Sequence, residues 1–169
     1  MSHQEHKQSA QALLARCAVI TLSDTRTPQT DRSGRLIQQL LAESGHAVAA
    51  CHLIPDETEQ LTPLVHSLLK RDDVDVILTN GGTGISPRDR TIDALQQLFD
   101  KQLPGFGELF RMLSFQQIGS AAMLSRAVAG MAAGKPIFCM PGSTKAVELA
   151  MASLILPELR HLLGELHKR

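Results

Sequence analysis

The chain has 169 residues, 43% of them hydrophobic and 20% charged, which is usual for a soluble globular protein and unlike a disordered or fibrous one. Seventeen basic and seventeen acidic residues cancel, so the charge balance argues against nucleic acid or an acidic membrane as a partner. The length matches one compact domain, and an aromatic content of 3% offers few platforms for stacking bases.

Cysteine usage and the N-terminal composition predict a cytoplasmic protein. Cys17, Cys51 and Cys139 are odd in number, and each falls in an apolar, strand-like run where a thiol is expected to be buried rather than paired. The N-terminus lacks the apolar core of a signal peptide, and no run approaches the ~20 apolar residues that cross a bilayer. We expect residues 1–14 to form a flexible tail and residues 15–169 a single domain.

Strands and helices are expected to alternate in the first half of the chain. Apolar runs of strand length cover residues 17–22, 47–54 and 74–78. Between them, apolar residues recur at helical spacing over residues 36–41 and 61–69. This order is typical of right-handed βαβ units and predicts a parallel sheet with helices on both faces.

Polar, glycine and proline residues mark the ends of two predicted helices. Asp31 or Ser33 can cap the first helix, and Gly45 closes it. Ser143 can cap a terminal helix, which should kink or break near Pro157 because proline lacks a backbone N–H.

The remaining part of the second half is less regular. A helix is expected over residues 91–98 and another after a break at Pro104. Apolar runs over residues 127–133 and 136–140 predict either a hairpin or two adjacent strands. The helix after Pro104 carries an apolar stripe that suits the core or a subunit interface. Its members are Phe106, Leu109, Phe110, Met112 and Leu113.

The segment over residues 74–91 is the strongest candidate for a binding site. A buried strand runs into Gly81, Gly82 and Gly84, with Thr83 between them. In open α/β sheets, ligands bind beyond the carboxyl ends of the strands, and glycines let a phosphate approach backbone N–H groups closely. A tight turn without a ligand explains the same residues equally well.

Several common sites are absent from the sequence. The chain contains no G-x-x-x-x-G-K-[ST] loop, G-x-G-x-x-G fingerprint, H-E-x-x-H pair, zinc-finger spacing or G-x-S-x-G elbow. Ordinary nucleotide loops, zinc sites and serine hydrolases therefore do not explain the glycines.

Two acidic residues, Asp56 and Asp89, follow predicted strands at their carboxyl ends. Together they could hold Mg²⁺, which is commonly bound by one or two carboxylates plus substrate phosphates. From spacing alone, the simpler interpretations are favoured. Asp56 could cap a helix, and Asp89 could pair with Arg88 or Arg90.

Two further segments could bind an anion. Ser125 and Arg126 precede an apolar run, and the Pro141-Gly142-Ser143 turn opens the terminal helix, whose first N–H groups favour a phosphate. A surface arginine and an ordinary helix cap are the alternative interpretations.

Taken together, these segments resemble the MoaB/Mog family of molybdenum cofactor biosynthesis proteins, which shares its domain type with the G domain of gephyrin. The resemblance extends from residue 16 to about residue 160, and as an ordered set the segments are highly specific. They are Ser23–Arg26, Asp31–Gly34, Ile54–Glu57, Leu78–Thr91, Pro104–Ser114, Leu124–Gly130 and Met140–Ala146.

The resemblance implies a three-layer α/β/α fold that assembles as a trimer or hexamer. It also implies binding of molybdopterin and transfer of adenylyl from MgATP to its terminal phosphate, with release of pyrophosphate. Asp56 and Asp89 match the acidic residues required for this magnesium-dependent reaction. The ligand-binding residues expected are Asp31, Ser33, Gly34, Gly81, Gly82, Thr83, Gly84, Ser125, Arg126, Pro141, Gly142 and Ser143.

Two other functions remain open. Some members of the MoaB branch have lost the acidic pair and need not catalyse, so a pterin-binding or scaffold protein is the main alternative, with contacts to other proteins of the pathway. A different pterin or nucleotide substrate is a third possibility. Because this chain retains both Asp56 and Asp89, an adenylyltransferase is favoured.

Overall fold

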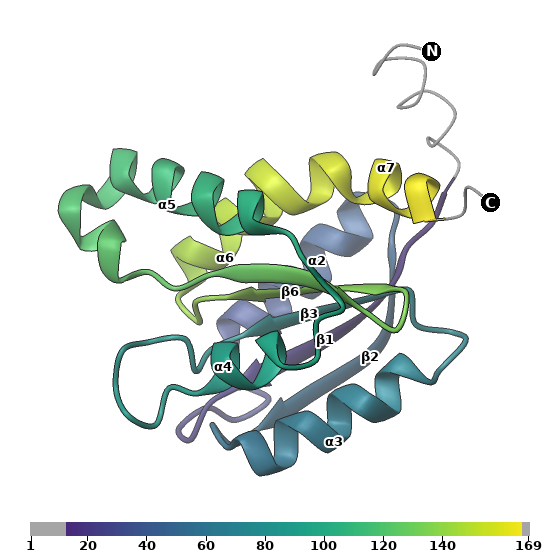
Figure 1. Cartoon of the computed structure of the whole chain (residues 1–169), viewed down its shortest axis with the longest axis horizontal. Helices are drawn as coiled ribbons and strands as arrows, with labels where there is room; N and C mark the ends of the chain where they lie inside the picture. The colour runs from purple at the N-terminus through teal and green to yellow at the C-terminus, as the bar shows by residue number, and fades with distance from the viewer. Residues whose placement is uncertain (1–12, 167–169) are drawn as a thin grey trace.

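The computed structural model describes residues 13–166, which form a six-stranded sheet between two layers of helices (Figure 1). The strand order is β2-β1-β3-β6-β5-β4, in which β2, β1, β3 and β6 are parallel, β5 is antiparallel to β6 and β4 is antiparallel to β5. The predicted α/β/α sandwich with a mostly parallel sheet is therefore confirmed. The strands are β1 (Arg16–Leu22), β2 (Ala47–Ile54), β3 (Val76–Asn80), β4 (Lys101–Gln102), β5 (Val128–Ala132) and β6 (Lys135–Met140).

Helices cover both faces of the sheet. One face carries α2, α5 and the C-terminal run α6-η2-α7, and the other carries α3 and α4 (Figure 1). Among the helices of residues 13–166, none is long and apolar enough to span a membrane. The helical segments are α2 (Arg32–Glu43), α3 (Thr58–Leu69), α4 (Thr91–Gln96), α5 (Pro104–Ile118), the 3₁₀ helix η1 (Gly119–Leu124), α6 (Thr144–Ala150), the π-helix η2 (Met151–Ile155) and α7 (Leu156–Leu166).

Side chains that alternate along the central strands fill two cores. Val19 and Leu78 pack with the α2, α5 and α6-η2-α7 layer, whereas Ile20 and Ile77 pack with α3 and α4. Because β1 and β3 are buried on both faces, each appears in the sequence as a continuous apolar run. This packing fixes the strand ends from which the loops of the site begin.

The predicted helix ends agree with the structure. Asp31 caps α2 by accepting the N–H of Gly34 at 2.9 Å, and Ser143 caps α6 by accepting the N–H of Ala146 at 3.2 Å. Gly45 follows α2 with φ = 75°, a left-handed conformation that favours glycine.

Between the two predicted alternatives for residues 127–140, the structure forms a hairpin. β5 and β6 pair antiparallel from Val128 opposite Cys139 to Ala132 opposite Lys135. The turn residues Ala133 and Gly134 both have positive φ, 47° and 77°, as in a two-residue hairpin turn whose twist matches the strands.

Of the kink or break predicted near Pro157, the break is not found, and an irregular turn lies just before the proline. The helix continues through Pro157 as α7, and the wider η2 turn lies immediately before it. Proline removes one backbone donor from a helix, and a π turn changes the hydrogen-bonding register by one residue. The irregularity therefore lies on the N-terminal side of the proline, and the helix is not interrupted.

The prediction that all three cysteines are buried is also wrong. Cys17 and Cys139 are buried, but Cys51 is exposed because β2 is an edge strand. Its sulfur lies 3.1 Å from Nε2 of Gln38. Of the predicted N-terminal tail, residues 1–12 lie outside the described part of the chain, and Leu13 packs against the larger core.

Candidate functional site

The glycine turn after β3 is shaped by close contacts that only glycine permits. Gly81 and Gly82 have φ values of 102° and 61°. A Cβ atom at Gly81 would collide with the carbonyl oxygen of Leu22 at the end of β1, and one at Gly82 would collide with the side chains of Thr91 and Asp56. The turn is therefore packed directly against the predicted acidic site.

Several N–H groups of this turn have no acceptor within the described residues. The N–H of Gly81 donates to the carbonyl of Met140 at 3.2 Å. Within residues 13–166, the N–H groups of Gly82, Thr83 and Gly84 donate to no protein acceptor. Thr83 is buried as a whole residue, whereas Gly82 is partly exposed and Gly84 is exposed, so the two glycines are the residues of the turn placed to bind an anion through their backbone.

Asp56 and Asp89 lie on either side of this turn. The Thr91 hydroxyl lies 3.5 Å from Oδ1 of Asp56, and a Cβ atom at Gly84 would lie 2.6 Å from Oδ2 of Asp89. Burial raises the pKa of Asp56, and the charges of Asp89 and then Asp24 raise it further. The structure thus brings together two acids that are 33 positions apart in the sequence.

Neither simpler interpretation of these acids matches the structure. The N-cap position of α3 is Glu57 rather than Asp56. Arg88 forms its ion pair with Asp24, at 2.9 Å, and Asp89 accepts the N–H of Ser86 at 3.0 Å.

The acid pair suits a divalent cation that also binds substrate. Within the described residues, no group of three His, Cys, Asp or Glu side chains could hold a metal by itself. Mg²⁺ is commonly held by one or two carboxylates together with substrate phosphates and water. Asp56 and Asp89, with free N–H groups between them, fit that description.

Asp31, Ser33 and Gly34 lie at the start of α2, but their polar atoms face the protein. Asp31 and Ser33 are buried, and both contact the guanidinium of Arg26. A Cβ atom at Gly34 would collide with the carboxylate of Asp31. This segment therefore shapes the wall of the site, and Arg26 is the residue that holds it in place.

Arg26 also joins this wall to the Pro141-Gly142-Ser143 turn. Its Nη2 donates to the carbonyl of Gly142 at 2.7 Å. A Cβ atom at Gly142 would lie 3.1 Å from the Cα of Gly81, so the two glycine turns touch. The loops after β1, β3 and β6 therefore form one site at the carboxyl edge of the sheet.

Arg126 braces the loop that carries Asp89. Its Nη1 donates to the carbonyls of Gly84 and Asp89 at 3.2 and 3.3 Å, and its Nη2 lies 2.9 Å from Asp93. Ser125, the C-cap residue of η1, is the neighbour of Arg126 and lies at the border of the same region. The two residues are brought to the site, with Arg126 occupied by protein contacts.

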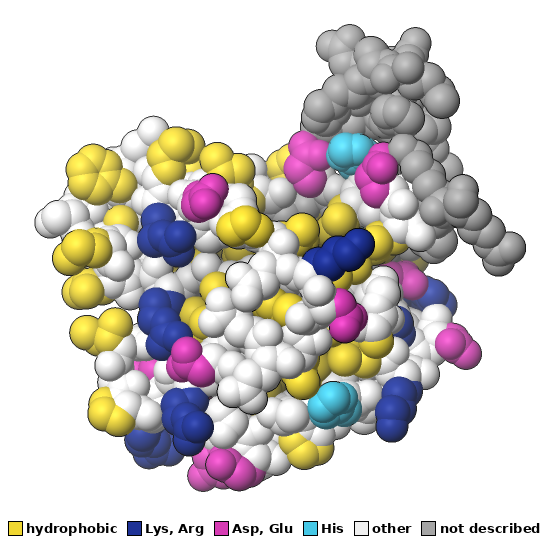
Figure 2. Space-filling model, in the orientation of Figure 1, with side chains coloured by type: hydrophobic (Ala, Val, Ile, Leu, Met, Phe, Trp, Pro, Cys, Tyr) yellow, Lys and Arg dark blue, Asp and Glu magenta, His cyan; other side chains and the backbone are white. Residues whose placement is uncertain are grey.

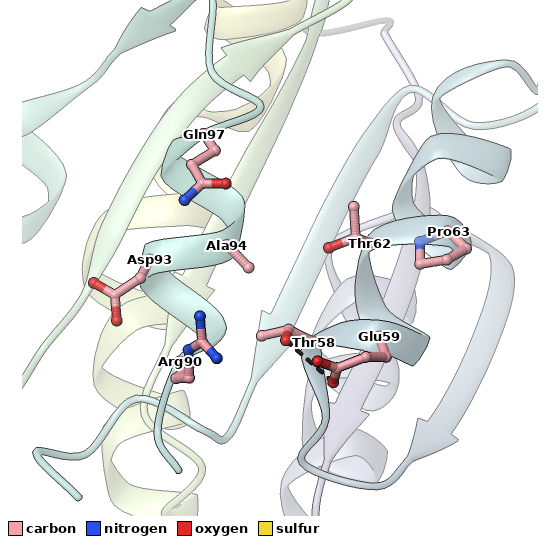
Figure 3. Close-up of a pocket in the computed structure, with 8 residues that line it drawn as sticks. All are labelled: Thr58, Glu59, Thr62, Pro63, Arg90, Asp93, Ala94 and Gln97. Atoms are coloured by element: carbon pink, nitrogen blue, oxygen red, sulfur yellow. Dashed lines mark hydrogen bonds between the residues drawn. The ribbon is translucent and has the colours of Figure 1, made fainter. Parts of the chain in front are cut away.

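A groove of about 470 Å³ lies between α3 and α4 (Figure 3). It is lined by Thr58, Glu59 and Thr62 from α3 and by Arg90 and Gln97 at the two ends of α4. None of the predicted site residues lines this groove.

Sequence reasoning missed three residues of the site. Asp24 accepts the N–H of Asp56 at 3.1 Å and pairs with Arg88, and Arg26 connects two loops. Asp24 and Arg26 fall inside the Ser23–Arg26 segment, and Arg88 lies directly before Asp89. The signal was membership of that segment for Asp24 and Arg26, and adjacency to Asp89 for Arg88.

Fold and site together define an α/β protein whose acids and glycine turns meet at the carboxyl edge of a parallel sheet. Comparison with known proteins identifies its family. The family described as "Probable molybdopterin binding domain" matches residues 18–161. The chain belongs to the MoaB/Mog family of molybdenum cofactor biosynthesis proteins, as the sequence predicted.

Individual relatives agree with this assignment. Molybdenum cofactor biosynthesis protein B of Bacillus cereus is 52% identical over 170 residues, covering 100% of both chains. A crystal structure of a molybdenum cofactor biosynthesis protein B has a TM-score of 0.90 at 52% identity and covers 93% of this chain and 98% of its own. The tungsten cofactor synthesizing protein MoaB from Pyrococcus furiosus has a TM-score of 0.83 at 34% identity, covering 92% and 98%.

Proposed function

We propose that the chain is a molybdopterin adenylyltransferase that uses MgATP and releases pyrophosphate. The observation that carries the proposal is the acid pair: Asp56 and Asp89 lie against a glycine turn in which the N–H groups of Gly82, Thr83 and Gly84 have no protein acceptor within residues 13–166. This combination suits a triphosphate with its metal, because it offers carboxylates to the cation and N–H donors to the anion.

In the proposed reaction, an oxygen of the terminal phosphate of molybdopterin attacks the α-phosphorus of ATP. The bond from that phosphorus to the oxygen bridging to the β-phosphate breaks, and pyrophosphate leaves with the electron pair. Nucleotidyl transfer of this kind needs positioning and charge stabilisation more than a protein nucleophile.

Each part of the site has a role in this scheme. Asp56 and Asp89 would hold Mg²⁺, which when bound neutralises phosphate charge. The N–H groups of Gly82 and Gly84 would bind phosphate oxygens, and Arg126 keeps the loop from Gly84 to Asp89 in shape through its two carbonyl contacts. Ser125 is proposed to face the pterin.

The test is pyrophosphate release by the purified full chain with molybdopterin, ATP and Mg²⁺. Asp56→Asn and Asp89→Asn should each lower turnover by about 10²-fold or more, the scale on which removal of one preorganised electrostatic group acts. Asp73→Asn is the matched control, because Asp73 pairs with Arg71 in the loop before β3.

The alternative function is a pterin-binding or scaffold protein without catalysis. Normal binding of molybdopterin combined with no pyrophosphate release by the wild-type chain would contradict the adenylyltransferase and support that alternative.

A further inference from the structure

The strongest additional feature is the ion pair between Arg88 and Asp24, and the inference from it rests on the proposed function. Nη2 of Arg88 lies 2.9 Å from Oδ2 of Asp24. The other oxygen of Asp24, Oδ1, accepts the backbone N–H of Asp56 at 3.1 Å. Arg88 therefore reaches from the β3–α4 loop to a carboxylate that also contacts the backbone of Asp56.

Electrostatics link Arg88 to the acid pair itself. Three carboxylates act together here: burial raises the pKa of Asp56, and the charges of Asp89 and Asp24 raise it further, whereas the charge of Arg88 lowers it. Arg88 is joined to Asp56 through Asp24, which contacts the guanidinium of Arg88 and the backbone N–H of Asp56. A divalent cation bound by Asp56 and Asp89 would supply the same compensation and would repel the guanidinium.

The ion pair is of a kind that opens readily. The side chains of Arg88 and Asp24 are 66% and 41% exposed, and exposed pairs add little to stability. The other two arginines of the site differ, because Arg26 and Arg126 each contact several protein groups and have fixed positions.

We propose that Arg88 is an exchangeable counter-ion of the acid pair. Its guanidinium lies on Asp24 while no cation is bound, and it transfers to a phosphate group of the nucleotide when Mg²⁺ occupies Asp56 and Asp89. Arg88 is then a phosphate-binding residue, and Asp24 is the carboxylate that competes with the phosphate for its guanidinium. The planar guanidinium suits this exchange, since it pairs equally with carboxylate and phosphate oxygens.

The first experiment measures Mn²⁺ binding to the full chain by calorimetry, without nucleotide. Arg88→Met removes a competing positive charge, so Mn²⁺ should bind about two- to five-fold more tightly, the range expected for an exposed charge pair. Arg90→Met is the control: Arg90 carries the same charge two residues away, but Arg88 is the arginine that pairs with Asp24. Unchanged or weaker Mn²⁺ binding by Arg88→Met would overturn the proposal.

The second experiment measures binding of α,β-methylene-ATP at saturating Mn²⁺. Arg88→Met should weaken it about tenfold or more, as expected for loss of a charge-assisted hydrogen bond. Asp24→Asn should leave it unchanged or tighten it, because Arg88 is released while Oδ1 can still accept the N–H of Asp56. A purely structural ion pair predicts equal weakening by both variants, and that result would defeat the exchange.

Two measurements keep the outcomes separate. Thermal unfolding of each variant shows whether the fold is kept, and Arg88→Lys, which retains the charge, should bind the nucleotide with intermediate affinity. If Arg88→Met weakens nucleotide binding and Asp24→Asn does not, but no pyrophosphate is released, the exchange stands and the catalytic proposal fails. If pyrophosphate is released but both variants weaken nucleotide binding equally, the catalytic proposal stands and the exchange fails. A wild-type chain that binds no nucleotide also overturns the exchange.

Discussion

The carboxylate of Asp56 is expected to lower the stability of the folded protein. This carboxylate is partly buried beside two other acids, and its pKa is raised above the ordinary value of 3.8. A raised pKa means that the charged form is disfavoured in the folded state. Such a residue suits a site that waits for a cation, because function is often gained at the expense of stability.

The pH dependence of stability should show this directly. Since folding raises the pKa of Asp56, its contribution to stability is most favourable below about pH 3.8 and is lost as the pH rises through the higher folded-state pKa. At pH 7.5 Asp56→Asn should therefore unfold at a higher temperature than the wild type, and the difference should shrink toward pH 4. Thermal unfolding at the two pH values, without divalent cations, measures the effect.

Asp73 provides a control of opposite sign. Its hydrogen bond with Arg71 lowers the pKa of Asp73 to about 2, so the charged form is the one favoured by folding. Asp73→Asn should leave stability at pH 7.5 unchanged or slightly lower, as expected for an exposed pair. Destabilisation by Asp56→Asn at pH 7.5 would show that the carboxylate is held by favourable contacts, against the assignment made above.

At the scale of elements, the glycine turn after β3 links the sheet to the acid pair. Gly82 combines a left-handed backbone, φ = 61°, with contacts so close that a Cβ atom would displace Thr91 and Asp56. Gly134 in the β5–β6 turn has a similar backbone, φ = 77°, but no atom lies within 4 Å of the position of its Cβ. A comparison of Gly82 with Gly134 therefore separates the effect of backbone strain from the effect of steric crowding.

Gly82→Ala should therefore lower stability and damage the site together. Backbone strain at such a position costs about 1–2 kcal/mol, and crowding adds to it. Gly134→Ala should show the strain cost alone. Chemical unfolding together with Mn²⁺ binding distinguishes them: Gly82→Ala should weaken Mn²⁺ binding and Gly134→Ala should not. Wild-type Mn²⁺ affinity in Gly82→Ala would mean that the acids do not depend on this turn.

Local patterns predicted the regular elements and their caps. The continuous apolar runs of β1 and β3 and the residues Asp31, Gly45 and Ser143 report interactions within a few positions of the chain. The two-residue strand β4 and the helices η1 and η2 were not predicted. They depend on packing against distant segments, which leaves no periodic pattern in the sequence.

The candidate site was predictable only where a rule relates sequence to position in the sheet. Asp56 and Asp89 follow strands of one parallel sheet, so their meeting at its carboxyl edge follows from the topology, and the family resemblance supplied their roles. The contacts of Arg26 with Gly142, 116 positions away, and of Arg126 with Gly84, 42 positions away, follow from no such rule. The arginines of the site were for that reason missed or assigned only to a ligand.

At the scale of the whole molecule, one end carries an apolar surface that the monomer does not cover. Exposed side chains from α5 and η1 gather there, on the left of Figure 2. They are Leu109, Met112, Phe115, Ile118, Met123 and Leu124. Phe106 and Phe110 of the predicted apolar stripe are buried in the core, whereas Leu109 and Met112 of the same stripe are exposed. Large exposed apolar patches commonly mark protein interfaces.

We propose that this surface joins copies of the chain into a trimer or hexamer. The double variant Phe115→Glu/Ile118→Glu should sediment as a monomer that keeps its fold, because both side chains lie outside the core. Ile85→Glu is the control, since Ile85 is 70% exposed and belongs to the glycine loop rather than to α5 or η1. A wild-type chain that is monomeric at tens of micromolar, or a double variant that sediments as the wild type does, would contradict this interface.

Assembly through this surface would also affect the site. η1 ends at Leu124, directly before Ser125 and Arg126, and Arg126 braces the loop that carries Asp89. Burying η1 against a partner would fix the position of that brace. The monomeric double variant should therefore bind Mn²⁺ more weakly than the wild type although no site residue has changed. Equal Mn²⁺ affinity in the monomer and the assembled protein would show that the brace holds without a partner.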